Sequence, residues 1–227
     1  ISFLQERGID IEENDVPTDM ELSAQMVLRE QFAEKSLASA LLGKDVQEVQ
    51  LGGEVYRYEN AMGAVQFHSD GSFSVQLEPS AVPISNGAEQ AALLVLKKLG
   101  FEGVVLDRTD TQMVVRQTWE GAPLLGQNAT VRWNETGLVS IEGSRLMGTP
   151  NKDGERTAIT VPTALITFLN ELDRMGDVYS GIQRITPGYI STVSLSGPTE
   201  LTPVWEIVTD TSVYQLNTIS GELSRIE

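Results

Sequence analysis

Three stretches of the chain alternate apolar and polar residues on both sides of a short polar turn that contains glycine. They are Val65–Val75, Val131–Ile141 and Tyr214–Ile226, with turn glycines at Gly71, Gly137 and Gly221. A period of two is typical of a strand with one buried face, and a turn glycine supplies a positive φ at no steric cost. Each stretch is therefore predicted to be a β-hairpin.

A segment with apolar residues at helical spacing precedes each hairpin. These residues are Leu22, Met26, Ala33, Leu37 and Leu41 in the first segment, Leu93, Leu94, Leu96 and Leu99 in the second, and Leu165, Ile166, Leu169 and Leu172 in the third. Such spacing gives a helix one apolar stripe that can pack on a sheet. We expect three amphipathic helices.

Local signals set the ends of these helices. Thr18 with Glu21, and Asn86 with Glu89, have the spacing of a capping box, and Pro162 suits the first turn of a helix that starts near Thr160. Glycine follows the last apolar residue of each segment, as it often does beyond a helix end. The stop glycines are Gly43, Gly100 and Gly176.

The order of helix followed by antiparallel strands recurs three times, which predicts an α+β fold of repeated units, each with one helix on an antiparallel sheet of meander hairpins. The predicted units span residues 1–82, 83–150 and 151–227. Pro83 with the Ser85–Gly87 turn marks the first boundary, and Gly148–Gly154 marks the second. Units of this size bury little surface alone, so we expect them to pack on one another.

Charge and composition narrow the classes of function. The 227 residues include 16 Lys and Arg against 32 Asp and Glu, a formal net charge of −16. Because nucleic acids and anionic lipid surfaces are bound through Lys and Arg, neither is an expected partner. Cysteine is absent from the sequence, which excludes disulfides, thiolate metal sites and cysteine nucleophiles.

Candidate chemistry is sparse. The single histidine, His68, lies beside the Asp70-Gly71 turn, and the apolar neighbours in its strand place it on the polar face. Any Ser-His-Asp triad would need this residue, but a solvated or structural histidine is the preferred interpretation. Phosphate loops and dinucleotide motifs are absent, and Gly52-Gly53 is interpreted as a turn.

Carboxylates offer the remaining candidate sites. Asp107 with Asp110, and the segment Asn151–Glu155, are the best candidates for Ca²⁺ or Mg²⁺, but neither has the ligand spacing of a calcium loop and both are interpreted as polar turns. Glu206 lies between Trp205 and Ile207, and alternation predicts an exposed strand residue. A carboxylate pair of the glycosidase type is a spatial arrangement, so the sequence leaves it open. We expect no catalytic residue, no metal and no cofactor.

Three tryptophans, Trp119, Trp133 and Trp205, lie in predicted strands. Aromatic residues in strands usually pack in the core, and the alternative is an exposed anchor for a partner protein. The sequence does not distinguish which surface binds, so the binding residues stay open.

Several segments resemble known families. The end of the chain resembles the closing motif of PepSY-type and YycI-type domains, and three further segments resemble YycI in the same order. The segments at the end are Leu201-Thr-Pro-Val-Trp205-Glu-Ile-Val-Thr-Asp210, Val213-Tyr-Gln-Leu-Asn217 and Ser220-Gly-Glu-Leu223, and the further ones are Phe3–Ile11 with Val16-Pro17, Arg116–Leu125 with Val139–Gly143, and Ile185–Tyr189.

The resemblance implies a non-enzymatic protein on the extracytoplasmic face of the membrane of a Gram-positive bacterium, tethered by one N-terminal transmembrane anchor that precedes the present chain. It implies that the protein modulates the sensor histidine kinase of a cell-wall two-component system together with a YycH-type partner. Two alternatives stay open. One is a PepSY-like inhibitory or peptide-binding module that acts on a secreted hydrolase, and the other is a hydrolase that works through carboxylates.

Overall fold

The chain folds into two compact units, described here from a computed structural model. Unit 1 comprises Ile1–Val27 and Pro150–Glu227, and unit 2 comprises Leu28–Thr149. The structure describes residues 2–11, 16–20, 22–28, 33–151, 156–178, 180–193 and 197–226. The protein is mixed α/β, with antiparallel strands as its main element.

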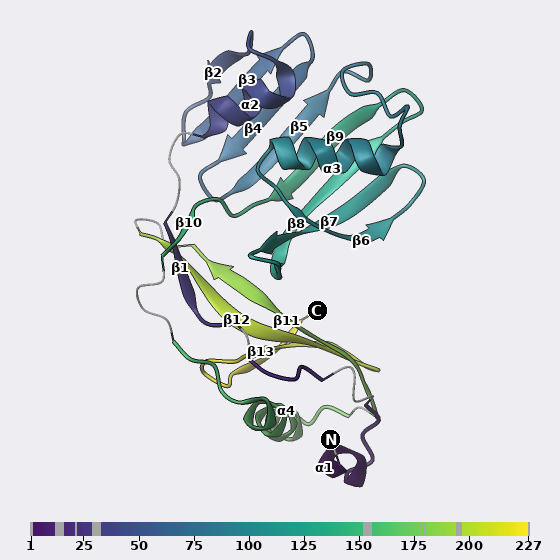
Figure 1. The fold of residues 1–227 in the computed structure, drawn as a ribbon, viewed down its shortest axis with the longest axis vertical. Coiled ribbons are helices and arrows are strands. Elements are labelled where there is room, and N and C mark those ends of the chain that lie inside the picture. The colour runs from purple at the N-terminus through teal and green to yellow at the C-terminus, as the bar shows by residue number, and fades with distance from the viewer. Residues whose placement is uncertain are drawn as a thin grey trace. The chain divides into compact units, whose positions relative to one another are not determined.

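Strands β2 to β9 of unit 2 form one antiparallel sheet, called here the large sheet (Figure 1), in the order β2-β3-β4-β5-β9-β8-β7-β6. Its strands are β2 (Gln47–Gln50), β3 (Val55–Asn60), β4 (Gly63–His68), β5 (Ser72–Leu77), β6 (Gly103–Arg108), β7 (Gln112–Trp119), β8 (Ala122–Trp133) and β9 (Leu138–Ser144). The central pair, β5 with β9, joins an N-terminal group of strands to a later group.

Helices α2 (Glu34–Leu42) and α3 (Ala88–Lys98) lie on the same face of the large sheet, as Figure 1 shows. The apolar stripes of both helices pack on alternate residues of the strands, because side chains of a strand point to opposite faces. The fully buried members of this core include Ala38, Leu96, Val65, Val75, Met113, Val131 and Ile141. Arg145 ties the end of α3 to the sheet, since its Nη1 donates to the Leu99 carbonyl at 2.8 Å and its guanidinium lies 4.7 Å from the Phe67 ring centroid.

Unit 1 has a smaller antiparallel sheet, in which β12 pairs with β11 on one side and with β1 and β13 on the other. Strand β14 pairs with β13. The elements are α1 (Ser2–Glu6), β1 (Gln25–Leu28), α4 (Val161–Met175), β11 (Ile182–Thr192), β12 (Thr199–Thr209), β13 (Val213–Asn217) and β14 (Leu223–Ile226), with β10 (Thr149–Asn151) at the boundary between the units.

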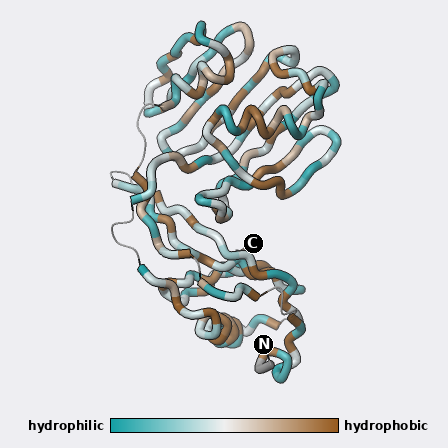
Figure 2. Tube along the Cα trace, in the orientation of Figure 1, coloured by the Kyte–Doolittle hydropathy of each residue, from teal (hydrophilic) through white to brown (hydrophobic). Residues whose placement is uncertain are grey.

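Helix α4 covers one face of this smaller sheet, and Figure 2 shows hydrophobic (brown) residues in the helix. Phe168 of α4 meets the ring of Tyr214 edge-on, with the centroids 5.9 Å apart. Trp205 is 1% exposed and belongs to the same core. The predicted core position of Trp205 is therefore confirmed. No helix in the part of the chain that the structure describes has the length and apolar character needed to cross a membrane.

All three predicted hairpins are confirmed. Val65 faces Val75 across β4–β5, Val131 faces Ile141 across β8–β9, and β13 pairs with β14. The reason for glycine at position 137 differs from the expected one, because Gly137 is not among the glycines with positive φ. A Cβ at this position would lie 2.1 Å from the Pro79 carbonyl oxygen. Glycine is required there by close backbone approach.

The helix predictions are confirmed for the third segment and modified for the others. Helix α4 begins beside Thr160 and ends at Gly176, whose φ is 73°. Helix α3 begins at Ala88 without a side-chain cap, so the predicted Asn86 cap is wrong, and Glu89 pairs instead with Arg108.

The first predicted helix is wrong in its N-terminal half. Strand β1 occupies Gln25–Leu28, and Met26 faces Glu200 of β12. Helix α2 starts only at Glu34 and ends before Gly43 as expected. Glu21 lies outside the described residues. Pairing with a strand far along the chain overrides the local helical spacing.

The unit boundaries also differ from those expected. Residues 28–149 form one unit because β5 pairs with β9, whereas the N-terminal residues join the C-terminal unit through β1 and β12. The α+β class agrees with the structure at the level of helices on antiparallel sheets. Repetition of one helix-on-sheet unit stays a prediction.

Tyr214 gives unit 1 a testable pH dependence. Its hydroxyl donates to Asp177 Oδ2 at 2.7 Å, and burial first, then this bond, raises its pKa above 10. The folded state favours the neutral phenol, so this stabilisation is complete below pH ~10 and is lost as pH rises through the folded pKa. We expect Tyr214→Phe to lower unfolding free energy by about 1 kcal/mol at neutral pH.

The difference between wild type and Tyr214→Phe should shrink above pH ~10, because the unfolded wild-type tyrosine then ionises. Urea unfolding of both proteins across neutral and alkaline pH measures it. A difference that stays constant over this range would contradict the assigned role of Tyr214.

Candidate binding surface

The face of the large sheet opposite α2 and α3 carries mostly polar side chains; we call it the open face. Cross-strand pairing sets its rows, because facing residues of antiparallel strands share a face. One row runs through Val49, Arg57, Gln66, Ser74, Glu142, Thr130 and Val114, and the next through Gln47, Glu59, Ala64, Gln76, Ser140, Arg132 and Gln112. The described helices of unit 2, α2 and α3, pack on the opposite face.

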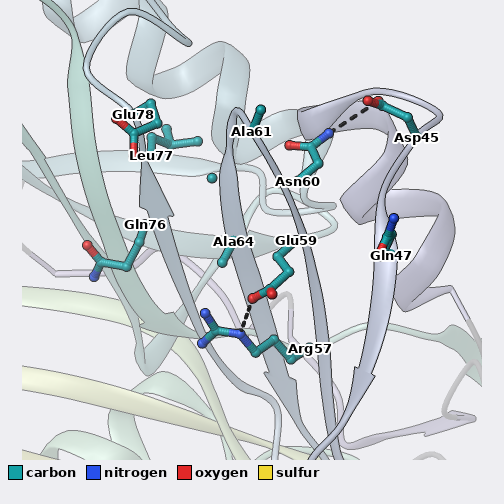
Figure 3. Close-up of a pocket in the computed structure, with 11 residues that line it drawn as sticks. Asp45, Gln47, Arg57, Glu59, Asn60, Ala61, Ala64, Gln76, Leu77 and Glu78 are labelled. Atoms are coloured by element: carbon teal, nitrogen blue, oxygen red, sulfur yellow. Dashed lines mark hydrogen bonds and ion pairs between the residues drawn. The ribbon is translucent and has the colours of Figure 1, made fainter.

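A groove of about 680 Å³ lies at one end of the open face, where β3 turns into β4 (Figure 3). Arg57 and Glu59 lie in it side by side on β3, with Arg57 Nε 2.8 Å from Glu59 Oε2. Asn60 closes its end, since its Nδ2 donates to the Leu42 carbonyl at 2.9 Å and to Asp45 Oδ1 at 3.2 Å. These polar groups largely satisfy one another, so the groove offers hydrogen bonding rather than an apolar pocket.

Strand β6 forms one edge of the large sheet, where β7 is its one partner among the strands that the structure describes. Three consecutive apolar side chains on it are exposed: Val104 by 50%, Val105 by 37% and Leu106 by 45%. Native edge strands are usually blunted by charge, proline or a covering element, and consecutive exposed apolar residues are unusual there. This strand is the strongest candidate for a binding surface.

The register fixes which backbone groups of β6 are free. Thr118 N donates to the Glu102 carbonyl at 2.8 Å, so this facing pair is hydrogen-bonded. Because hydrogen-bonded and non-bonded pairs alternate along antiparallel strands, the N–H and C=O of Val104 point to β7 and those of Val105 point away from it. A bulge between Val105 and Asp107 then shifts the ladder by one residue.

Most of the charged side chains beside β6 are paired. Arg108 pairs with Glu89, and Lys97 pairs with Glu102 at 3.6 Å. Asp107 is exposed on the open face, opposite Val114 of β7, and makes no ion pair within the described residues. The edge therefore combines apolar side chains with an acidic side chain that has no ion-pair partner.

The candidate histidine lies on the open face, as expected. His68 Nε2 is 2.9 Å from Gln66 Nε2, two residues away on the same strand. The neighbouring carboxylate, Asp70, accepts from both the backbone N and the Oγ of Ser72, and these bonds lower its pKa. Asp70 thus stabilises its own turn.

The candidate metal ligands are not brought together. Asp107 and Asp110 are both exposed, and the described part of the chain contains no cluster of three or more metal-binding side chains. Of the segment Asn151–Glu155, only Asn151 is described; its remaining residues lie outside the described ranges.

Glu206 corrects an expectation. It is 8% exposed instead of solvated, because β12 lies between β11 and β13, with Thr186 and Gln215 on either side of Glu206. Arg184 on β11 lies beside it, with Nη2 4.0 Å from Glu206 Oε1. Neighbouring strands shield this carboxylate.

The other two tryptophans lie in unit 2. Trp133 is buried and donates from Nε1 to the Asp110 carbonyl at 2.7 Å, which fixes the turn between β6 and β7. Trp119 is half-buried at the end of β7 and lines a small cavity of about 330 Å³ with Met147 and Gln117. Trp119 therefore matches neither of the two predicted roles, a fully buried core residue or a fully exposed anchor for a partner.

Sequence reasoning did not single out β6. Its apolar run is typical of an ordinary buried strand. Whether a strand lies at an edge depends on the order of strands in the sheet, which is a property of the fold. The only local signal is the unbroken run Val104-Val105-Leu106, which lacks the alternation seen in the three hairpins.

Comparison with known proteins identifies a shared fold and no family. No family profile matches the chain, and no curated protein matches it. An uncharacterized protein from Eubacterium rectale ATCC 33656 superposes with a TM-score of 0.54 at 11% identity, over 94% of this chain and 88% of that one. The Bacillus megaterium YpeB C-terminal domain gives a TM-score of 0.41 at 12% identity, over 88% and 100%. The first likeness shows that the fold occurs in a solved structure.

Proposed function

We propose that this protein is a non-enzymatic binding module that regulates another protein by direct contact. The observation that carries the proposal is the exposed apolar edge strand β6, whose side chains and free backbone groups are suited to a protein partner. The open face supports it further, since its polar rows extend the area available for contact.

The proposed target is the sensor histidine kinase of a cell-wall two-component system, contacted on the extracytoplasmic side together with a YycH-type partner. Support for this target comes from the segments that resemble YycI, which occur in order along the chain. Five of them lie mainly in strands: one across β7 and β8, and one each in β9, β11, β12 and β13. The protein would be anchored by a transmembrane helix that precedes Ile1.

Co-purification tests this proposal. The full-length tethered protein should retain the sensor kinase when both are extracted from the membrane, and deletion of its gene should change expression of the kinase's target genes. A control variant, Leu94→Lys, alters an exposed apolar residue of α3 that lies outside β6 and should retain the kinase. Absence of association together with unchanged signalling after deletion would overturn the proposal.

A second candidate function is inhibition of a secreted hydrolase by a peptide-binding module. The same exposed edge favours it, because strand addition is a common way to capture extended peptides. Inhibition of secreted proteolytic activity by the purified protein, with no effect of gene deletion on kinase signalling, would favour this candidate over the first.

A further inference from the structure

We propose that β6 is a strand-addition site for an extended segment that carries two adjacent apolar residues and a basic residue aligned with Asp107. The inference rests on the proposed function, because it names the chemistry of the partner that would bind the same surface. It is argued from the backbone, side chains and charge of β6.

The backbone of β6 is ready to accept another strand. Val105 presents its N–H and C=O to the free edge, and Gly103, two residues earlier, has the same orientation. An added strand would form main-chain hydrogen bonds at these residues without displacing any bond of the β6–β7 ladder. The bulge beyond Val105 limits this regular stretch to the first half of β6.

The side chains of β6 set the apolar part of the preference. Val104 faces Arg116 and lies on the open face, whereas Val105 faces the buried Val115 and lies on the helix face. An incoming strand has side chains on both faces, so one apolar residue contacts Val104 and its neighbour contacts Val105. Burial of exposed valine and leucine surface would drive the association.

The charge of the edge sets the polar part. Asp107 shares the open face with Val104 and has no ion-pair partner within the described residues. Lys or Arg on an incoming strand would pair with it, and the chain's net charge of −16 favours the approach of a basic segment. A second copy of this chain is a poor occupant because it carries the same net charge of −16.

A synthetic peptide tests the site. The probe is a short soluble peptide with two adjacent valines, for Val104 and Val105, and a lysine two residues beyond the valine that contacts Val104, and binding is followed by NMR shifts of the β6 amides during titration into the whole protein. We expect Val105→Pro to weaken binding by about tenfold or more, because it removes an edge N–H while leaving the ladder to β7 intact. Val105→Thr keeps the N–H and the branched shape and should bind within a few-fold of wild type.

The probe itself supplies controls that do not depend on protein folding. N-methylation of the peptide at alternate residues should abolish binding in one register and preserve it in the other, because only one set of N–H groups faces β6. Replacing lysine with glutamate should weaken binding, and Asp107→Asn should reduce this charge preference. Equal binding of both N-methylated peptides, binding only to α3 or the groove, or self-association through β6 in place of peptide binding would overturn the inference.

The outcomes separate this inference from the proposed function. Kinase retention that is unaffected by Val105→Pro would leave the proposed function standing and overturn the β6 site. Peptide binding at β6 without any association with the kinase would support the β6 site and overturn the proposed target.

Discussion

Trp205→Ala is expected to lower the free energy of unfolding of unit 1 by about 3–5 kcal/mol. Trp205 is 1% exposed, and it lies on the central strand β12 opposite Pro187 of β11 and Leu216 of β13. Truncation leaves a large cavity in a core that α4 covers on one side only. A loss of this size is a large fraction of the stability of a typical domain.

Hydrogen exchange and circular dichroism in urea measure this effect without relying on the lost fluorophore. Amides of β11, β12 and β13 should lose most of their protection, while those of the large sheet keep theirs, because Trp205 belongs to the core of unit 1 alone. Trp205→Phe retains a ring and should lose clearly less stability than Trp205→Ala. A loss below about 1 kcal/mol for Trp205→Ala would be inconsistent with the described packing.

Gly137→Ala is expected to destabilise unit 2 by about 3 kcal/mol, at the upper end of the range for overpacking. The added Cβ would lie 2.1 Å from the Pro79 carbonyl oxygen and 2.5 Å from that of Val82. Both contacts are with backbone, and Leu138 N donates to the Val82 carbonyl at 3.0 Å, so relief requires displacement of a bonded segment.

A comparison at Gly121 separates steric approach from backbone conformation. Gly121 has a φ of 86° with no atom within 4 Å of an added Cβ, so Gly121→Ala should cost about 1–2 kcal/mol and Gly121→Asn less, because asparagine tolerates this region. At Gly137, asparagine should be no better than alanine. Rescue of Gly137 by asparagine in thermal unfolding would indicate a conformational requirement instead.

Local patterns predicted the elements whose stability depends on neighbours in sequence. The three hairpins and α4 follow from alternation, turn glycines and the helix-ending Gly176. The failures are non-local. Met26 has helical spacing to Ala33 and Leu37 yet pairs with Glu200, because a place in the small sheet buries more of its segment than an isolated helix would.

The candidate site depends on strand order, so it could not be predicted from the sequence. Val104, Val105 and Leu106 resemble a buried strand, and only the position of β6 outside β7 exposes them. The prediction for Glu206 was wrong in the opposite direction. Alternation predicted a solvent-exposed side chain, whereas the side chain is buried between the flanking strands. His68, by contrast, was placed correctly because its face follows from the two-residue period of one strand.

Hydrogen exchange of the Val105 amide tests most directly that this protein acts through a partner strand at β6. The amide should exchange rapidly in the free protein and slow strongly on addition of the kinase's extracytoplasmic portion, while the Leu94 amide in α3 changes little. A bound complex in which the Val105 amide exchanges as fast as in the free protein would contradict the account.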